Sequence, residues 1–184
     1  MLVNRLNEDK ELNIRVNGEL LEQLKDVLTS KKIKLSTRKR IVRCFVLSTV
    51  IYASETWTSS RDAENKIDAF EMWLYRKMLK VSYKNRISNE EVLNRVKAKK
   101  KLLSELKNRK LQYMGHILRS SGLQKQLLEG KVGSRRLRGR PRNTWWADIR
   151  KWTGKSLYDL ARMAEDRTKW RTMASRASKG QGTT

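Results

Sequence analysis

Apolar residues recur every three or four positions along most of this chain, and proline occurs only once, at Pro141. That spacing places side chains on one face of an α-helix, whereas a half-buried strand needs strict alternation. The pattern therefore predicts an all-α fold. The expected inward-facing residues are Leu20, Leu21, Leu24, Val27, Leu28; Ile41, Val42, Phe45, Val46, Thr49, Val50; Ile67, Phe70, Leu74, Met78, Val81; Val92, Leu93, Val96; Leu103, Leu106, Tyr113, Met114, Ile117, Leu118; Trp145, Ile149, Trp152; and Leu157, Leu160, Met163, Trp170.

Helix boundaries are marked by capping residues. A serine followed three positions later by an acidic residue is typical of a helix N-terminus, and glycine is typical of a helix end. The expected starts are Ser59 with Asp62, Ser88 with Glu91, and Ser156 with Asp159, and the expected ends are Gly122 and Gly154.

A glycine- and arginine-rich run interrupts the helical pattern. Residues 129–143 hold Gly130, Gly133 and Gly139 and almost no apolar side chain, which opposes a continuous helix. We therefore expect a basic linker between a helical bundle and a small helical unit with a disordered tail. The predicted divisions are 1–58 for the first helices, 59–128 for the bundle, 129–143 for the linker and 144–184 for the C-terminal unit.

Positive charge is concentrated in the second half of the chain. The formal net charge is +24, and the stretch from Arg95 to Arg142 carries sixteen basic and two acidic residues. A field of this kind attracts polyanions, so we expect RNA or DNA as the partner. The predicted phosphate contacts are Lys99, Lys100, Lys101, Arg109, Lys110, Arg135, Arg136, Arg138, Arg140 and Arg142. Because Trp145 and Trp146 are adjacent, only one can face the core, and Trp146 is a candidate either for base stacking or for covering the core.

The residues 138–142, Arg-Gly-Arg-Pro-Arg, have the core pattern of an AT-hook. Glycine lets the backbone approach DNA closely, proline keeps the strand extended, and the arginines can enter a narrow minor groove. A match of only five residues has modest specificity in a chain rich in Lys and Arg, so three interpretations of this motif are open. They are minor-groove reading, sequence-independent phosphate binding, and a solvated linker or nuclear-import signal.

Catalytic and metal chemistry find little support in the sequence. Cys44 and His116 are the only residues of their types, so one chain can form neither a disulfide nor a zinc knuckle. The aspartates are scattered, whereas metal-dependent phosphoryl transfer needs clustered carboxylates. His116 lies among basic residues on an expected helix, where a packed or phosphate-facing role is favoured over that of a general base. We expect no catalytic residue, metal or cofactor, no membrane span or signal peptide, and a nuclear or cytoplasmic location.

Several stretches occur in an order that is familiar from one protein family. They include Ile51–Thr58 (IYASETWT), Ala69–Leu79, Asn89–Leu93, Arg109–Arg119 (RKLQYMGHILR), the 138–142 run and Asp166–Trp170 (DRTKW). In this respect the chain resembles the region after the catalytic palm of non-LTR (LINE-type) retrotransposon reverse transcriptases. One departure is Ala53, where the family commonly has glycine.

The resemblance implies that 1–58 is the end of the palm with the first thumb helices, 59–128 the helical thumb, and the rest a C-terminal nucleic-acid-binding extension. Such a fragment would grip template–primer, element RNA or target DNA during target-primed reverse transcription, together with the rest of the parent enzyme. The aromatic-x-Asp-Asp motif that holds catalytic Mg²⁺ in the family is missing from the sequence, so the fragment is not expected to be an enzyme. A truncated or host-adopted helical adaptor, or an enzyme in its own right, are the alternatives.

Overall fold

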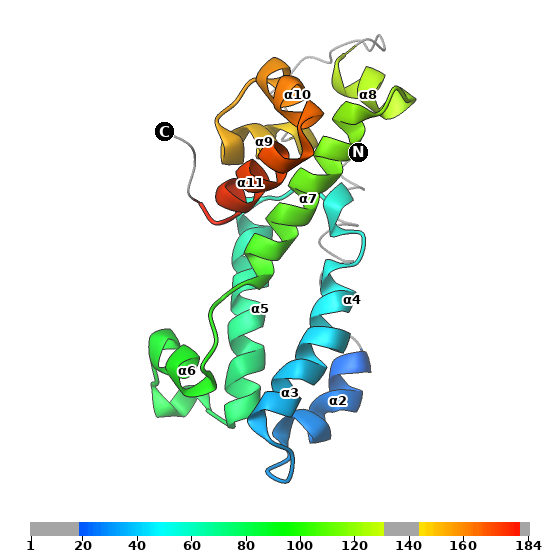
Figure 1. The fold of residues 1–184 in the computed structure, drawn as a ribbon. Helices are drawn as coiled ribbons and strands as arrows, with labels where there is room; N and C mark the ends of the chain where they lie inside the picture. Colours follow the sequence, from blue (N-terminus) through cyan, green and yellow to red (C-terminus); the bar gives the residue numbers. More distant parts are fainter. Residues whose placement is uncertain (1–18, 131–143, 181–184) are drawn as a thin grey trace, which may run out of the picture. The chain divides into compact units, whose positions relative to one another are not determined.

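The computed structural model describes residues 19–130 and 144–180. Within these ranges every regular element is helical, which confirms the expected all-α class (Figure 1). The helices are α2 (Glu19–Thr29), α3 (Leu35–Ile41), α4 (Ser48–Ile51), α5 (Arg61–Leu79), α6 (Asn89–Val96), α7 (Leu102–Arg119), α8 (Leu123–Leu128), α9 (Trp145–Thr153), α10 (Leu157–Glu165) and α11 (Arg167–Ser178). A π-helical segment (Val42–Leu47) joins α3 to α4, and 3-10 turns cover Ser54–Thr56 and Tyr83–Asn85.

The chain divides into two compact units that differ from the expected divisions. Unit 1 is the described part of Met1–Tyr52 together with Arg61–Leu103, and unit 2 is Ala53–Ser60 together with the described part of Ser104–Thr184. Most of the predicted linker lies outside the described residues. The sequence did not determine how the C-terminal helices pack, and in the structure α9, α10 and α11 share one buried core with α7.

Unit 1 is organised around α5. Its apolar stripe of Ile67, Phe70, Leu74 and Met78 is buried, as the spacing predicts. Figure 1 shows α6 on one side of this helix and α2 and α3 on the other. Burial of one stripe against two neighbours is the usual source of stability for a helix of this kind.

Two cations of α3 close the ends of other helices in unit 1. The Arg38 guanidinium donates to the carbonyl of Leu28 in α2 at 3.0 Å and to that of Met78 in α5 at 2.6 Å. The Lys39 ammonium donates to the carbonyl of Val96, the last residue of α6, at 2.9 Å. Helix C-terminal carbonyls have no partner within their own helix and carry partial negative charge, so these two cations stabilise the packing of three helices.

The π-helical segment changes which residues of the second helical run face inward. Val42, Val46 and Val50, each four positions apart, are buried. Phe45 is 57 % exposed and Thr49 is exposed with its hydroxyl bonded to the Phe45 carbonyl at 2.7 Å. The prediction for Phe45 and Thr49 is wrong because a π-helix bonds residues five apart and turns more slowly than the assumed α-helix.

Most of the expected helix boundaries are confirmed. The hydroxyls of Ser88 and Ser156 accept hydrogen bonds from the backbone N–H three residues later, and Gly154 ends α9 at φ 66°. The expected end at Gly122 is wrong, since α7 stops at Arg119 and Gly122 instead precedes the short helix α8. That glycine could not be assigned from sequence because α8 is only one and a half turns long and has no side-chain cap.

Candidate nucleic-acid interface

Helices α7 and α11 pack closely at a glycine. A Cβ atom added to Gly115 would lie 2.6 Å from Cε2 of Trp170, inside van der Waals contact. The Trp170 side chain is buried and its indole N–H donates to the Leu111 carbonyl at 3.0 Å, so the ring cannot move aside freely. Gly115 is therefore what allows α11 to approach α7, and the stretches 113–119 and 166–170, far apart in sequence, become neighbours.

This approach creates a basic cleft of about 530 Å³ in unit 2. We name it the α7–α11 cleft. From α7 it is lined by Arg109, Gln112, Tyr113, His116 and Arg119, from α11 by Arg167, Trp170 and Arg171, and from the 3-10 turn by Glu55. Four arginines and a histidine thus face one carboxylate. The α7 residues are spaced three and four apart, which puts them on the face opposite the buried residues Leu111 and Leu118.

Local capping holds the cations of the cleft in place. The Asp166 carboxylate accepts the backbone N–H groups of Lys169 at 3.1 Å and Thr168 at 2.8 Å, which begins α11 and lowers the pKa of Asp166 below its ordinary value of 3.8. Arg119 donates to the carbonyl of Ala164, in the last turn of α10, at 3.1 Å. A guanidinium has five N–H donors, so this bond leaves further donors on an exposed side chain.

A segment of the chain upstream of α5 is tied into the same unit. The indole N–H of Trp145 donates to the Glu55 carbonyl at 2.7 Å, and the Ser59 backbone N–H donates to Asp148 Oδ2 at 2.6 Å. We call residues 53–60 the strap. It begins at Ala53, whose φ of 55° and ψ of 15° lie in the left-handed region that favours glycine.

Lys110 must be removed from the predicted phosphate contacts. Its side chain is fully buried, and its ammonium donates to Asp148 Oδ2 at 2.6 Å and to the Trp57 carbonyl at 2.8 Å. The same ammonium lies 5.3 Å from the ring centre of Trp145 and 5.2 Å from that of Trp152. A group without exposed surface cannot reach a phosphate. The prediction failed because helix α7 carries Lys110 on its buried face, where a carboxylate compensates the charge.

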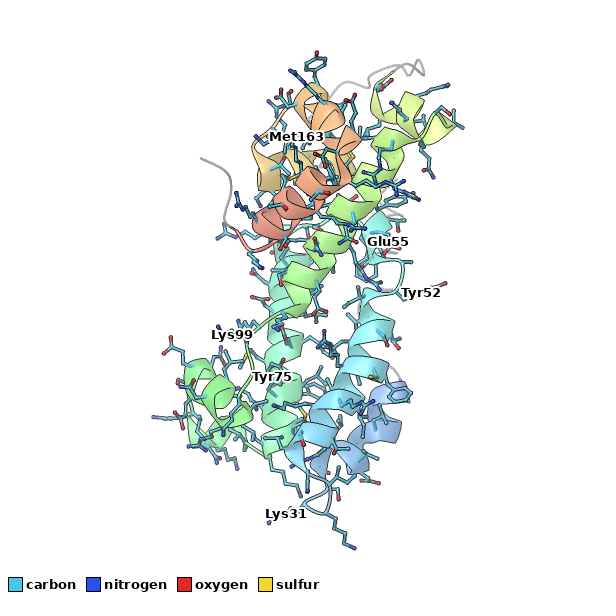
Figure 2. All side chains as sticks on the ribbon, in the orientation of Figure 1. Lys31, Tyr52, Glu55, Tyr75, Lys99 and Met163 are labelled. Carbon is cyan, nitrogen blue, oxygen red and sulfur yellow. The ribbon has the colours of Figure 1, made fainter. Side chains whose placement is uncertain are left out.

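The remaining predicted contacts are distributed over both units. Lys99, Lys100 and Lys101 are exposed in the segment between α6 and α7, where Figure 2 labels Lys99. Lys100 lies 3.5 Å from the Asp68 carboxylate, and the backbone N–H of Lys101 donates to Glu71. Trp146 is half-buried against the core of unit 2, in agreement with the covering role. Arg135, Arg136, Arg138, Arg140 and Arg142 lie outside the described residues.

The sequence analysis missed Arg119, Arg167 and Arg171 as members of one site, although it considered a phosphate-facing His116. His116 is exposed and lines the cleft, as does Glu55, which Figure 2 labels. Charge density alone pointed to 95–142, because α11 contributes its two cleft arginines singly rather than in a run. The available signal was the recurrence of basic residues on the exposed face of α7 opposite its apolar stripe.

The interpretation of the α7–α11 cleft rests on its own residues. Over residues 19–130 and 144–180, no three His, Cys, Asp or Glu side chains gather as a metal site requires. In that part of the chain no helix combines the length and apolarity needed to cross a bilayer. Searches of protein-family models, of curated proteins and of solved structures all end without a match.

Proposed function

We propose that this chain is a nucleic-acid-binding module, and that the α7–α11 cleft grips the phosphates of an RNA or DNA strand. The observation that carries the proposal is the gathering of Arg109, Arg119, Arg167 and Arg171 around one depression. Guanidinium groups bind phosphate oxygens in bidentate fashion. With a net charge of +24, the rest of the molecule reinforces this attraction at long range.

The proposed setting is the thumb and C-terminal extension of a LINE-type reverse transcriptase. Support comes from three of the stretches that resemble this family. Residues 53–58, 109–119 and 166–170 are far apart in sequence but all belong to unit 2. Buried or capping contacts join them, among them Lys110 to Trp57 and Trp170 to Leu111. The proposal assigns the chain a binding role on template–primer, element RNA or target DNA, while polymerase chemistry belongs to the palm of the parent enzyme.

The test compares the wild-type protein with the variant Arg167→Gln/Arg171→Gln. Binding of fluorescein-labelled RNA, duplex DNA and hybrid is measured by anisotropy between 50 and 200 mM salt. Each lost phosphate contact removes about 0.9 from the slope of log K against log salt for duplex DNA and about 0.7 for a single strand. We therefore expect the double variant to bind more weakly and with a slope smaller by about 1.4 to 1.8.

The matched control is Arg162→Gln/Arg176→Gln, which removes the same charge from exposed positions of α10 and α11 that do not line the cleft. If the two variants lose affinity equally, binding is a property of total charge and the cleft has no special role. If the wild-type affinity is insensitive to salt, the proposed function itself is wrong.

A further inference from the structure

Unit 1 contains a second basic groove, which the sequence analysis did not anticipate. It is open, encloses about 1570 Å³, and lies along the C-terminal half of α5 and the segment that leads to α6. Among its lining residues are the cations Arg76, Lys77, Lys80, Lys84, Arg86 and Lys100, against the single carboxylate of Asp68. We name it the Trp73 groove after its one lining tryptophan.

Trp73 offers an aromatic surface in the groove. Its side chain is 45 % exposed, although tryptophan is usually largely buried. The ring is stacked on the buried Phe70, with centres 6.1 Å apart and planes 16° from parallel, and the Lys77 ammonium lies over the ring at 5.7 Å from its centre. A base that stacks on the Lys77 side of the ring has to displace this flexible side chain. A tryptophan held in this way on a helix is a pre-positioned stacking platform.

The backbone at the rim of the groove adopts conformations that disfavour the side chains present. Lys80 has φ 56° and Arg86 has φ 47°, both in the left-handed region. Lys80 ends α5 in a Schellman arrangement, with Lys80 N–H bonded to the Lys77 carbonyl at 3.1 Å and Val81 N–H to the Arg76 carbonyl at 3.0 Å. Glycine would adopt this conformation without strain. The groove thus has a cationic side chain at two positions where glycine would be less strained. This indicates that the charges of Lys80 and Arg86 have a function.

Arg76 fixes the wall that carries these cations. Its guanidinium donates to the Ile87 carbonyl at 2.7 Å and to Asn89 Oδ1 at 3.0 Å, which ties the segment before α6 to α5. The groove therefore has its shape before any ligand arrives, and little ordering is needed on binding.

We infer that the Trp73 groove binds a single-stranded segment of nucleic acid, with one base stacked on Trp73 and phosphates held by Lys80, Lys84 and Arg86. This rests on the proposed function for the class of ligand and adds where and how an unpaired strand is held. An accessible aromatic face can stack only on a base whose own face is free, and duplex interiors offer none. The combination of ring and cations therefore favours a single strand over a duplex.

The experiment separates base stacking from charge. Binding of an oligouridylate of about eight nucleotides is compared with binding of an abasic strand of equal length and charge, for the wild type and for Trp73→Ala. Stacking of one base predicts that Trp73→Ala weakens oligouridylate binding about 5- to 150-fold and leaves the abasic strand unaffected. Trp73→Phe should restore part of the affinity, and Tyr158→Ala, which removes an exposed aromatic side chain from α10, should change neither.

Lys80→Gly supplies a readout that a structural role would not give. It should raise Tm by about 2–4 °C, because glycine relieves the left-handed strain, while lowering the affinity for both strands. Equal affinity of the wild type for both strands, no effect of Trp73→Ala, or an equal effect on duplex DNA would overturn this inference and leave the proposed function standing. Failure of the wild type to bind any polynucleotide would overturn both.

Discussion

Lys110 Nζ lies 2.6 Å from Asp148 Oδ2, and both side chains are buried in unit 2. The pair also engages the strap, since Lys110 donates to the Trp57 carbonyl and Asp148 accepts the Ser59 N–H. Two helices and an upstream segment thus meet at one compensated charge pair. Its neighbour Arg109 is exposed and lines the α7–α11 cleft, so adjacent basic residues have opposite roles.

The first prediction separates these two roles. Lys110→Met leaves the Asp148 charge buried without its partner and should lower the free energy of unfolding by about 3–5 kcal/mol. Arg109→Gln should change stability little and should weaken binding of RNA or DNA. Urea denaturation and anisotropy titration measure the two quantities. An affinity per folded molecule that drops for Lys110→Met would contradict the buried role of Lys110.

A second prediction concerns the contact between α7 and α11. Alanine normally stabilises a helix by about 1 kcal/mol relative to glycine, but Gly115→Ala places its methyl group inside contact distance of the Trp170 ring. We expect a net loss of about 1–3 kcal/mol in the free energy of unfolding. Thermal or urea unfolding measures it.

The control for that contact is the double variant Gly115→Ala/Trp170→Phe. A smaller ring leaves room for the methyl group, so the combined loss should be clearly smaller than the sum of the two single losses. Strict additivity would mean that Gly115 and Trp170 do not constrain one another.

The third prediction concerns acid stability. The Ser156 hydroxyl, which donates to Asp159, lowers the pKa of that carboxyl, and backbone N–H groups lower the pKa of Asp166, both from 3.8. A carboxyl with a lowered pKa in the folded state contributes stability that is complete above its unfolded value. That stability is lost as pH falls through the folded pKa. We expect stability to decrease below about pH 4.

Asp159→Asn/Asp166→Asn tests the assignment, because neither asparagine titrates. Asparagine at 166 can still cap α11, and asparagine at 159 can still accept from the Ser156 hydroxyl. The variant should show a shallower fall in the free energy of unfolding between pH 5 and pH 2 than the wild type does. Parallel curves for the two proteins would assign the acid sensitivity to other carboxyls.

The fold class and many helix ends were predictable because they depend on local rules. Ser88 and Ser156 cap helices through bonds that span three residues, and the α5 stripe from Ile67 to Met78 follows simple helical spacing. Phe45 was misassigned because a π-helical turn changes that spacing. No feature of the local sequence pattern predicts such a turn. Such local rules predict the extent and buried face of a single helix but not its contacts with other helices.

The site was less predictable because it depends on contacts between distant residues. Which face of α7 is buried decides that Lys110 is structural and Arg109 is exposed, and this follows from the position of Asp148 in α9. Charge density could not find the Trp73 groove either, although five basic residues and no acid lie between Arg76 and Arg86. Their significance depends on Arg76 holding the segment before α6 against α5.

The strap has a consequence for how the protein is made. Ser59 leaves the ribosome 89 residues before Asp148, its hydrogen-bond partner. At usual rates of synthesis that interval is about 4–18 s, and every residue of unit 1 emerges before it ends. The hydrogen bond between Ser59 and Asp148 can therefore form only after the last residue of unit 1 has been made. Translation that stopped before Thr144 would leave the strap without its acceptor on α9.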